Sequence, residues 1–141
     1  MNNCIFCDIL AGEEPVSIVY QDDTCTAFMD LNPVNRGHTL VVPNRHATYL
    51  ADLDTETAGA MMQVALKVAA AIRASDIRSE GVNLFLADGE AAGQEVFHVH
   101  LHVLPRFEGD GFGLKHRPDY PKEAARSELD AVAAALRDAL S

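Results

Sequence analysis

Residues 98–103 read HVHLHV, so a histidine alternates with an apolar residue over six positions. Successive side chains of a β-strand point to opposite faces of its sheet, and this period of two predicts a strand within the longer segment 96–107. The apolar residues would face a core, while His98, His100 and His102 would form one row on the opposite face. Neighbouring histidines in the row would lie roughly 6.5–7 Å apart at their Cα atoms, from a rise of about 3.3 Å per residue. The chain must therefore fold so that one face of a sheet carries imidazoles.

Four other short runs have the composition of β-strands. The runs at 17–23, 24–30 and 38–43 are rich in β-prone residues and follow one another closely, which predicts an antiparallel meander. The run at 81–89 would supply a further strand, followed by the loop 89–94 and the histidine segment. Together with the histidine segment, these runs predict a sheet of about five strands.

Two longer segments have the period of amphipathic helices. Residues 54–75 begin with Asp54 and Thr55 as cap candidates, and residues 121–141 form the second segment. Each segment would turn one apolar stripe toward the core: Met61, Ala65, Val68 and Ile72 in the first, and Leu129, Val132, Leu136 and Leu140 in the second. The predicted fold class is therefore α+β, an antiparallel β-sheet with one long helix packed on it and a C-terminal helix.

Length and charge exclude several classes of partner. A chain of 141 residues is long enough for a single domain, 1–141, with a core of its own. Its net charge of −10, with no cluster of Lys and Arg, would repel a nucleic-acid backbone, so nucleic acid is not an expected partner. No apolar run approaches the length that crosses a bilayer, and no membrane partner is expected. A small anionic ligand remains compatible, because backbone amides and a few side chains can bind a phosphate locally.

The N-terminal segment and the cysteines indicate the compartment. The segment MNNCIFCDIL has no basic region and carries Asp8 within its apolar run, unlike a secretory signal. The chain has three cysteines, an odd number, which favours a compartment in which thiols stay reduced or bind metal. We therefore expect a cytoplasmic protein.

The row of histidines has three interpretations on spacing alone. A solvated strand face is the common case for a single histidine, but three in register beside a glycine-containing loop make chance a poor explanation. A three-histidine metal site fits because His-x-His is a familiar spacing of zinc ligands. A nucleophilic site fits as well, with one imidazole attacking and another assisting. Spacing does not choose between the last two.

Several blocks of the sequence resemble the histidine-triad superfamily of nucleotide hydrolases and transferases. The segment HVHLHVL has the His-φ-His-φ-His-φ-φ pattern of that superfamily, where φ is an apolar residue. The segments CIFCDILAGEEP, FMDLNPVNRGHTLVVPNRH and GEAAGQEVFHVHLHVLPR are similar to its three blocks, in the same order. The resemblance covers the well-matched residues 1–105 and leaves 106–141 as a variable C-terminal region. It implies a homodimer whose two central sheets are continuous.

Cys4 and Cys7 form a Cys-x-x-Cys pair near the N-terminus. The residues alone leave open two buried thiols, a redox pair or half of a zinc site, and the thioredoxin type is disfavoured because the strand that should precede it is missing. The resemblance to the zinc-carrying, bacterial-type branch implies that His46 and His98 complete the site. Four protein ligands leave no position for water, so this zinc would be structural. Cys25 would be a buried core thiol.

The resemblance also implies the reaction. The middle histidine, His100, would attack the α-phosphorus of a nucleotide and form a covalent nucleotidyl-histidine that water then hydrolyses. His102 would hydrogen-bond a phosphate oxygen, and Gln94 would be the amide on the phosphate side. Gly93 would let the loop backbone approach the ligand. Glu95 stands where the family often has Ser or Thr, and its main-chain N–H would serve instead.

The nucleoside would lie between the first block and the FMDLNP segment. Asp30 matches the acidic position that binds both ribose hydroxyls, and His38 matches a position near the ribose. Four apolar residues would form the base slot: Phe6, Ile9, Phe28 and Leu31. Without the resemblance these four would be assigned to the core. A slot with few contacts to base edges predicts a loose base preference in which purines are favoured.

Three positions qualify the expected activity. Ala87 stands where the family commonly has Asn or Gln, and Asp88 adds a carboxylate that would weaken phosphate binding unless it points away. Arg106 would either contact an outer phosphate or lie on the surface. The expected substrate is a dinucleoside polyphosphate or a nucleoside phosphoramidate, with release of AMP or GMP. The alternatives are a purine-nucleotide sensor with little turnover, and a metallohydrolase that binds its metal through the three histidines.

Overall fold

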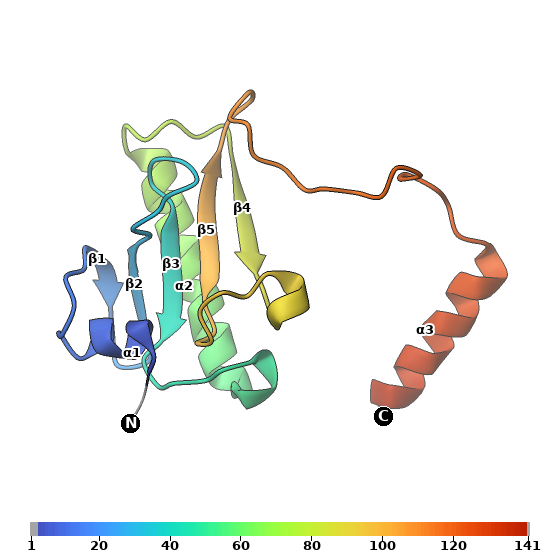
Figure 1. Ribbon diagram of the computed structural model, residues 1–141, viewed down its shortest axis with the longest axis horizontal. Coiled ribbons are helices and arrows are strands. Elements are labelled where there is room, and N and C mark those ends of the chain that lie inside the picture. Colours follow the sequence, from blue (N-terminus) through green and yellow to red (C-terminus); the bar gives the residue numbers. More distant parts are fainter. Residues whose placement is uncertain (1–2, 141) are drawn as a thin grey trace. The chain divides into compact units, whose positions relative to one another are not determined.

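The computed structural model describes residues 3–140, in two compact units, Met1–Gly111 and Phe112–Ser141. The first unit contains a five-stranded sheet in which all neighbouring strands are antiparallel (Figure 1). The strands, in sheet order, are β1 (Ile18–Gln21), β2 (Cys25–Met29), β3 (Thr39–Pro43), β5 (Leu101–Arg106) and β4 (Gly81–Leu86). The predicted α+β class and five-stranded antiparallel sheet are confirmed.

The first three strands form the predicted meander. The turn between β1 and β2 is closed by Asp22, whose Oδ1 accepts the N–H groups of Thr24 and Cys25 at 2.8 Å each. β5 lies between β3 and β4, so that His102 pairs with Leu40 on one side and with Phe85 on the other. The histidine strand is therefore an interior strand of the sheet.

The long helix α2 (Thr55–Ala74) lies across one face of the sheet (Figure 1). It begins where the Asp54 side chain accepts the N–H of Thr57 at 2.7 Å, which satisfies an amide that has no partner within the helix. All four residues of the predicted stripe are buried. They pack on side chains from β2, β3 and β5: Cys25, Ala27, Val41, Leu101 and Val103.

The opposite face of the sheet carries the short helix α1 (Ile5–Leu10), which the sequence did not predict. Its Phe6 packs with Phe28, Leu40 and Val42 in a second, smaller cluster. Residues directly opposite on paired strands share a face, so His102, the partner of Leu40, lies on this side as well.

The predicted strand at 96–107 is too long at its N-terminal end, because β5 begins at Leu101. The Val99 N–H donates to the Ala47 carbonyl at 2.7 Å, outside the strand ladder. The His98 ring lies within a cluster of Cys and His side chains. These contacts draw the segment before β5 out of the sheet. There are two 3-10 turns among the described residues: Leu50–Asp52 lies between β3 and α2, and Glu90–Ala92 lies between β4 and β5.

The second unit contains the helix α3 (Arg126–Leu140), which begins later than the predicted 121. Its predicted inner stripe is not buried: Leu129 is 42% exposed and Leu140 is 86% exposed. A single helix has no neighbour within its own unit against which to bury an apolar stripe. The expectation of a core-facing stripe here is wrong for the described unit. Within residues 3–140 we find no helix with the length and apolar character that a bilayer span requires.

Candidate functional site

Four side chains from three separate segments meet at the N-terminal end of α1. Cys4 caps this helix and Cys7 lies in its first turn, while His46 follows β3 and His98 precedes β5. The four ligand atoms lie within 4.8 Å of one another. The structure thus brings together all four predicted metal ligands.

The spacing within this Cys/His cluster fits a tetrahedral zinc ion. Zn–N bonds of about 2.05 Å and Zn–S bonds of about 2.3 Å place ligand atoms about 3.3 Å apart for N···N and about 3.6 Å apart for N···S. Nδ1 of His46 lies 3.2 Å from Nδ1 of His98, and the sulfur of Cys4 lies 3.3 Å from the same His98 atom. The sulfur of Cys7 lies 3.4 Å and 3.6 Å from the two ring nitrogens. The residues present therefore fit zinc in donor type and in geometry.

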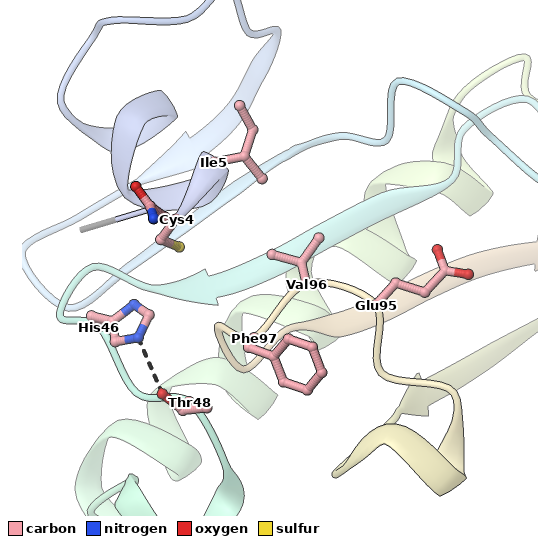
Figure 2. Close-up of a pocket in the computed structure, with 8 residues that line it drawn as sticks. Cys4, Ile5, His46, Thr48, Glu95, Val96 and Phe97 are labelled. Carbon is pink, nitrogen blue, oxygen red and sulfur yellow. Dashed lines mark hydrogen bonds between the residues drawn. The ribbon is translucent and has the colours of Figure 1, made fainter. Parts of the chain in front are cut away.

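The second nitrogen of each ring is also engaged, as metal-binding histidines require. His98 Nε2–H donates to the Pro43 carbonyl at 2.8 Å, which leaves the Nδ1 lone pair facing the cluster. His46 Nε2 lies 3.2 Å from the Thr48 hydroxyl (Figure 2). Burial lowers the pKa of His98, whose side chain is fully enclosed, and so favours the neutral, ligating form.

His100 has one ring nitrogen committed and one available. Its Nδ1 lies 2.8 Å from the His98 carbonyl, which can only accept, so Nδ1 carries the proton. The Nε2 atom of the neutral ring then carries a lone pair. Burial lowers the pKa of His100, with partial opposition from that carbonyl and from the Asp30 and Glu95 carboxylates. The ring packs edge-on against Phe6, with centroids 5.1 Å apart.

The available nitrogen of His100 reaches solvent. Among residues 3–140, every fully buried side-chain nitrogen or oxygen has a hydrogen-bond partner. Within that same range nothing in the chain hydrogen-bonds to His100 Nε2. The atom is consequently accessible, although the residue as a whole is only 7% exposed. A neutral imidazole with an accessible lone pair is suited to act as a nucleophile.

His102 adjoins His100 and contacts a second histidine. The rings of His100 and His102 lie 4.9 Å apart, and His102 Nδ1 lies 2.8 Å from Nε2 of His38. Burial lowers the pKa of His102 to about 4, and the neighbouring His100 and His38 add to the effect. Asp30 Oδ2 lies 3.5 Å from His38 Nε2. The structure therefore places Asp30, His38 and His102 side by side.

The predicted base slot is only partly assembled. Phe6 and Phe28 stack edge to face with centroids 5.4 Å apart, and Ile9 packs against the same cluster. Leu31 is 92% exposed and stands apart from them. Of the four predicted apolar residues, three gather where α1 packs on the sheet and Leu31 does not.

Gln94 holds the loop that precedes the histidine segment. Its Oε1 accepts the Gly89 N–H at 2.8 Å, and its Nε2 donates to the carbonyls of Thr48 and Val96 at 2.8 and 3.1 Å. The residue is buried, so this amide is fully occupied with backbone groups rather than turned toward a ligand. Gly93 adopts φ of +93°, a conformation that other residues rarely adopt.

The carboxylate of Asp88 is also committed to the backbone. Its Oδ1 accepts the Leu50 N–H at 3.0 Å. One oxygen of this carboxylate is therefore engaged by a backbone N–H. Ala87 is buried and offers no polar group.

Arg106 is held at the C-terminal end of β5. It forms a two-point contact with Asp110, at 2.7 Å from Nε and 2.9 Å from Nη2, and donates to Asn83 at 2.6 Å. These bonds support a structural role for Arg106 rather than contact with an outer phosphate.

A cleft of about 390 Å³ opens beside the Cys/His cluster. Figure 2 shows Cys4 and Ile5 on one side and Glu95, Val96 and Phe97 on the other. The described residues that line it include one carboxylate, from Glu95, and no lysine or arginine. The cleft lies between the Cys/His cluster and the loop that leads to His100.

The sequence of the first unit, Met1–Gly111, matches a known domain family over most of its length. The HIT domain pattern matches residues 11–109. The chain belongs to the HIT family. This membership confirms the resemblance to the histidine-triad superfamily.

Solved structures of HIT proteins have the same fold. A HIT family protein of Bacillus anthracis is 39% identical, with a TM-score of 0.90 over 99% of both chains. A zinc-bound histidine triad family protein of Mycobacterium smegmatis is also 39% identical, with a TM-score of 0.75 over 97% of both chains. That zinc-bound relative is in keeping with the Cys/His cluster.

A curated relative carries the name of an enzyme. Adenylylsulfatase HINT3 of Arabidopsis thaliana is 39% identical over 110 residues, which is 77% of this chain and 55% of that protein. The HIT family thus includes hydrolases that act on nucleotide derivatives. The chain spans about half of that relative's length.

Two features of the site were not predicted from the sequence. One is the contact between His38 and His102, and the other is the role of Gln94 as a backbone anchor. Neither has a local sequence signal, because His38 meets His102 only through the pairing of β3 with β5.

Proposed function

We propose that this HIT protein hydrolyses nucleoside phosphate derivatives at the α-phosphate through a covalent intermediate on His100. The substrate would be a nucleoside phosphoramidate or a dinucleoside polyphosphate, and the product AMP or GMP. The observation that carries the proposal is the hydrogen bond from His100 Nδ1–H to the His98 carbonyl, which leaves an accessible lone pair on Nε2.

The chemistry follows from these groups. The Nε2 lone pair would form a bond to the α-phosphorus while the bond to the leaving group breaks and its electron pair departs with that group. The imidazole becomes positively charged, and the His98 carbonyl that accepts from Nδ1–H stabilises this charge. Water then attacks the phosphorus, the N–P bond breaks and its electron pair returns to Nε2, while the proton that the water loses passes to solvent or to the departed leaving group.

His102 would hydrogen-bond a phosphoryl oxygen during transfer. Its position against His100 and its lowered pKa support a neutral ring at physiological pH. Asp30 would bind the ribose hydroxyls, and Phe6, Ile9 and Phe28 would contact a purine base. The main-chain N–H of Glu95 would bind phosphate, positioned by Gly93 and by the Gln94 anchor.

We further propose that Cys4, Cys7, His46 and His98 hold a structural zinc ion. Zinc would cross-link the N-terminal helix to the segment after β3, which carries His46, and to the segment before β5, which carries His98. It would also fix the His98 carbonyl to which His100 donates. Thiolate ligands need a reducing compartment, which supports a cytoplasmic location. A homodimer remains our expectation for the family, with sedimentation or light scattering as its test.

The metallohydrolase alternative receives no support from this geometry. His98 Nδ1 faces the Cys/His cluster, while His100 Nδ1 faces a carbonyl. Among the described residues, no group of adjacent metal-binding side chains contains all three histidines of the row. The three imidazoles are divided between different partners.

The test is release of AMP by the zinc-loaded protein. Adenosine 5'-phosphoramidate and diadenosine polyphosphates would each be incubated with the wild type, with His100→Ala and with His116→Ala. His116 lies in the second unit and serves as the matched control. We expect AMP from the wild type and from His116→Ala, and none from His100→Ala. Tight nucleotide binding without release by any form would instead support the sensor alternative.

A further inference from the structure

His38 lies immediately before β3 and is almost fully buried, 3% exposed, with both of its ring nitrogens engaged. The main-chain N–H of Val34 lies 3.1 Å from Nδ1, and His102 Nδ1 lies 2.8 Å from Nε2. Neither nitrogen is left for a ribose hydroxyl. A different role is therefore needed for this residue.

The two contacts determine where the protons are. The Val34 N–H can only donate, so His38 Nδ1 must carry a lone pair, and the ring cannot be doubly protonated while this bond exists. The single proton of His38 is then on Nε2, which donates to His102 Nδ1. His102 in turn carries its own proton on Nε2. Asp30 Oδ2, at 3.5 Å, is a more distant second acceptor for the same His38 proton.

The proton of His102 therefore points away from His38. Within residues 3–140 nothing in the chain accepts from His102 Nε2, and no fully buried side-chain nitrogen lacks a partner, so this N–H reaches solvent. It lies on the ring next to His100, at 4.9 Å between centroids. The alternative tautomer would present a lone pair at this position and would repel a phosphate oxygen.

We propose that His38 is a positioning residue that acts through His102: its Nε2–H holds the His102 ring in the tautomer and orientation in which His102 Nε2–H donates to the phosphate. The inference rests on the proposed function for its consequence in catalysis. The link between the two histidines is a separate claim about the free protein. The Val34 N–H, in the connection between β2 and β3, determines which nitrogen of His38 carries the proton. His38 in turn determines which nitrogen of His102 carries the proton.

The decisive variants are His38→Leu and His38→Gln. Leucine fills the buried space and removes the donor, whereas the glutamine amide can place an N–H near the position of the histidine Nε2. Thr39→Val is the matched control, because Thr39 is the next residue of the chain and is buried. Among the described residues, its hydroxyl bonds to the Met29 sulfur and the Gly37 carbonyl and not to a histidine. All forms would be prepared with zinc bound.

The kinetic expectation separates positioning from ribose binding. We expect His38→Leu to lower kcat about tenfold, with KM changed by less than about threefold, because the lost bond acts on the orientation of His102 during transfer. His38→Gln should recover most of kcat, and Thr39→Val should keep it. A rise in KM with unchanged kcat would overturn the proposal in favour of a ribose contact.

A double variant tests whether the effect passes through His102. In a His102→Ala background, His38→Leu should cause no further loss of the residual rate, because the group on which His38 acts has been removed. A full tenfold loss in that background would overturn the proposal.

Nitrogen NMR tests the link without any activity. Long-range ¹H–¹⁵N spectra of the wild type should show His102 protonated at Nε2 and unprotonated at Nδ1, and His38→Leu should shift both signals toward a tautomer mixture. His102 protonated at Nδ1 in the wild type would overturn the inference. If the wild type released no AMP while the spectra showed the expected tautomers, the proposed function would fail and the His38–His102 link would stand.

Discussion

Replacing Gln94 with alanine is expected to lower the free energy of unfolding by about 3 kcal/mol. The side chain makes three hydrogen bonds to backbone groups, each worth about 1 kcal/mol net. Gln94 is 4% exposed, and its truncation leaves the Gly89 N–H and the Thr48 and Val96 carbonyls without these side-chain partners. For a chain of this size, the loss corresponds to a fall in Tm of roughly 10 °C.

The assay is urea unfolding of zinc-saturated protein, followed by circular dichroism. We expect a lower midpoint with an unchanged slope, because the folded and unfolded surfaces stay nearly the same. Glu95→Ala is the control on the same loop; Glu95 is exposed and should change the free energy of unfolding by less than about 0.5 kcal/mol. Nucleotide affinity should fall in Gln94→Ala as a consequence of the loosened loop.

The opposite pattern would refute this reasoning. If Gln94→Ala kept the midpoint of the wild type and lost only nucleotide affinity, the amide would act on the phosphate directly. The bonds to Gly89, Thr48 and Val96 would then not account for the contribution of Gln94.

Three further predictions concern the metal, pH and the end of β5. Cys7→Ser, or chelation of the wild type, should lower stability by about 4 kcal/mol if zinc is supplied at about a thousand times its Kd; unchanged Tm on chelation would contradict the zinc site. Because burial lowers the pKa of His100, kcat/KM should be flat above pH 6.5 and fall only as pH drops further; an acid limb centred above pH 6.5 would contradict a buried neutral nucleophile. Asp110→Ala removes the partner of Arg106 and should lower the free energy of unfolding by about 2 kcal/mol, in thermal or urea unfolding, without lowering kcat. A selective loss of kcat would indicate that Arg106 contacts the substrate.

Local patterns predicted most of the fold. The stripe of α2 and the meander of β1, β2 and β3 are each encoded in neighbouring residues, and both appear where the pattern predicted them. The start of β5 was placed too early because the alternation continues through His98 and Val99. There, contacts with Cys4 and Ala47, distant in sequence, override the local preference. The stripe of α3 has a clear period, but a period does not supply a partner to cover it.

The candidate site was likewise predictable from the sequence only in part. Cys4, Cys7, His46 and His98 followed from a family resemblance, and the structure brings them together. The tautomers of His38, His100 and His102 could not be read from the sequence, because each depends on a carbonyl, an N–H or a ring brought in by the pairing of strands. Leu31 shows the converse: an apolar residue beside a site need not line it.

The central claim is the covalent bond between His100 Nε2 and the α-phosphorus. The most direct measurement is intact-protein mass spectrometry after rapid mixing with adenosine 5'-phosphoramidate and a neutral denaturing quench, followed by peptide mapping. We predict an adenylyl adduct on the peptide that contains His100, formed as fast as AMP is released and absent from His100→Ala. Release of AMP at the same rate with no adduct, or an adduct on another residue, would contradict the account.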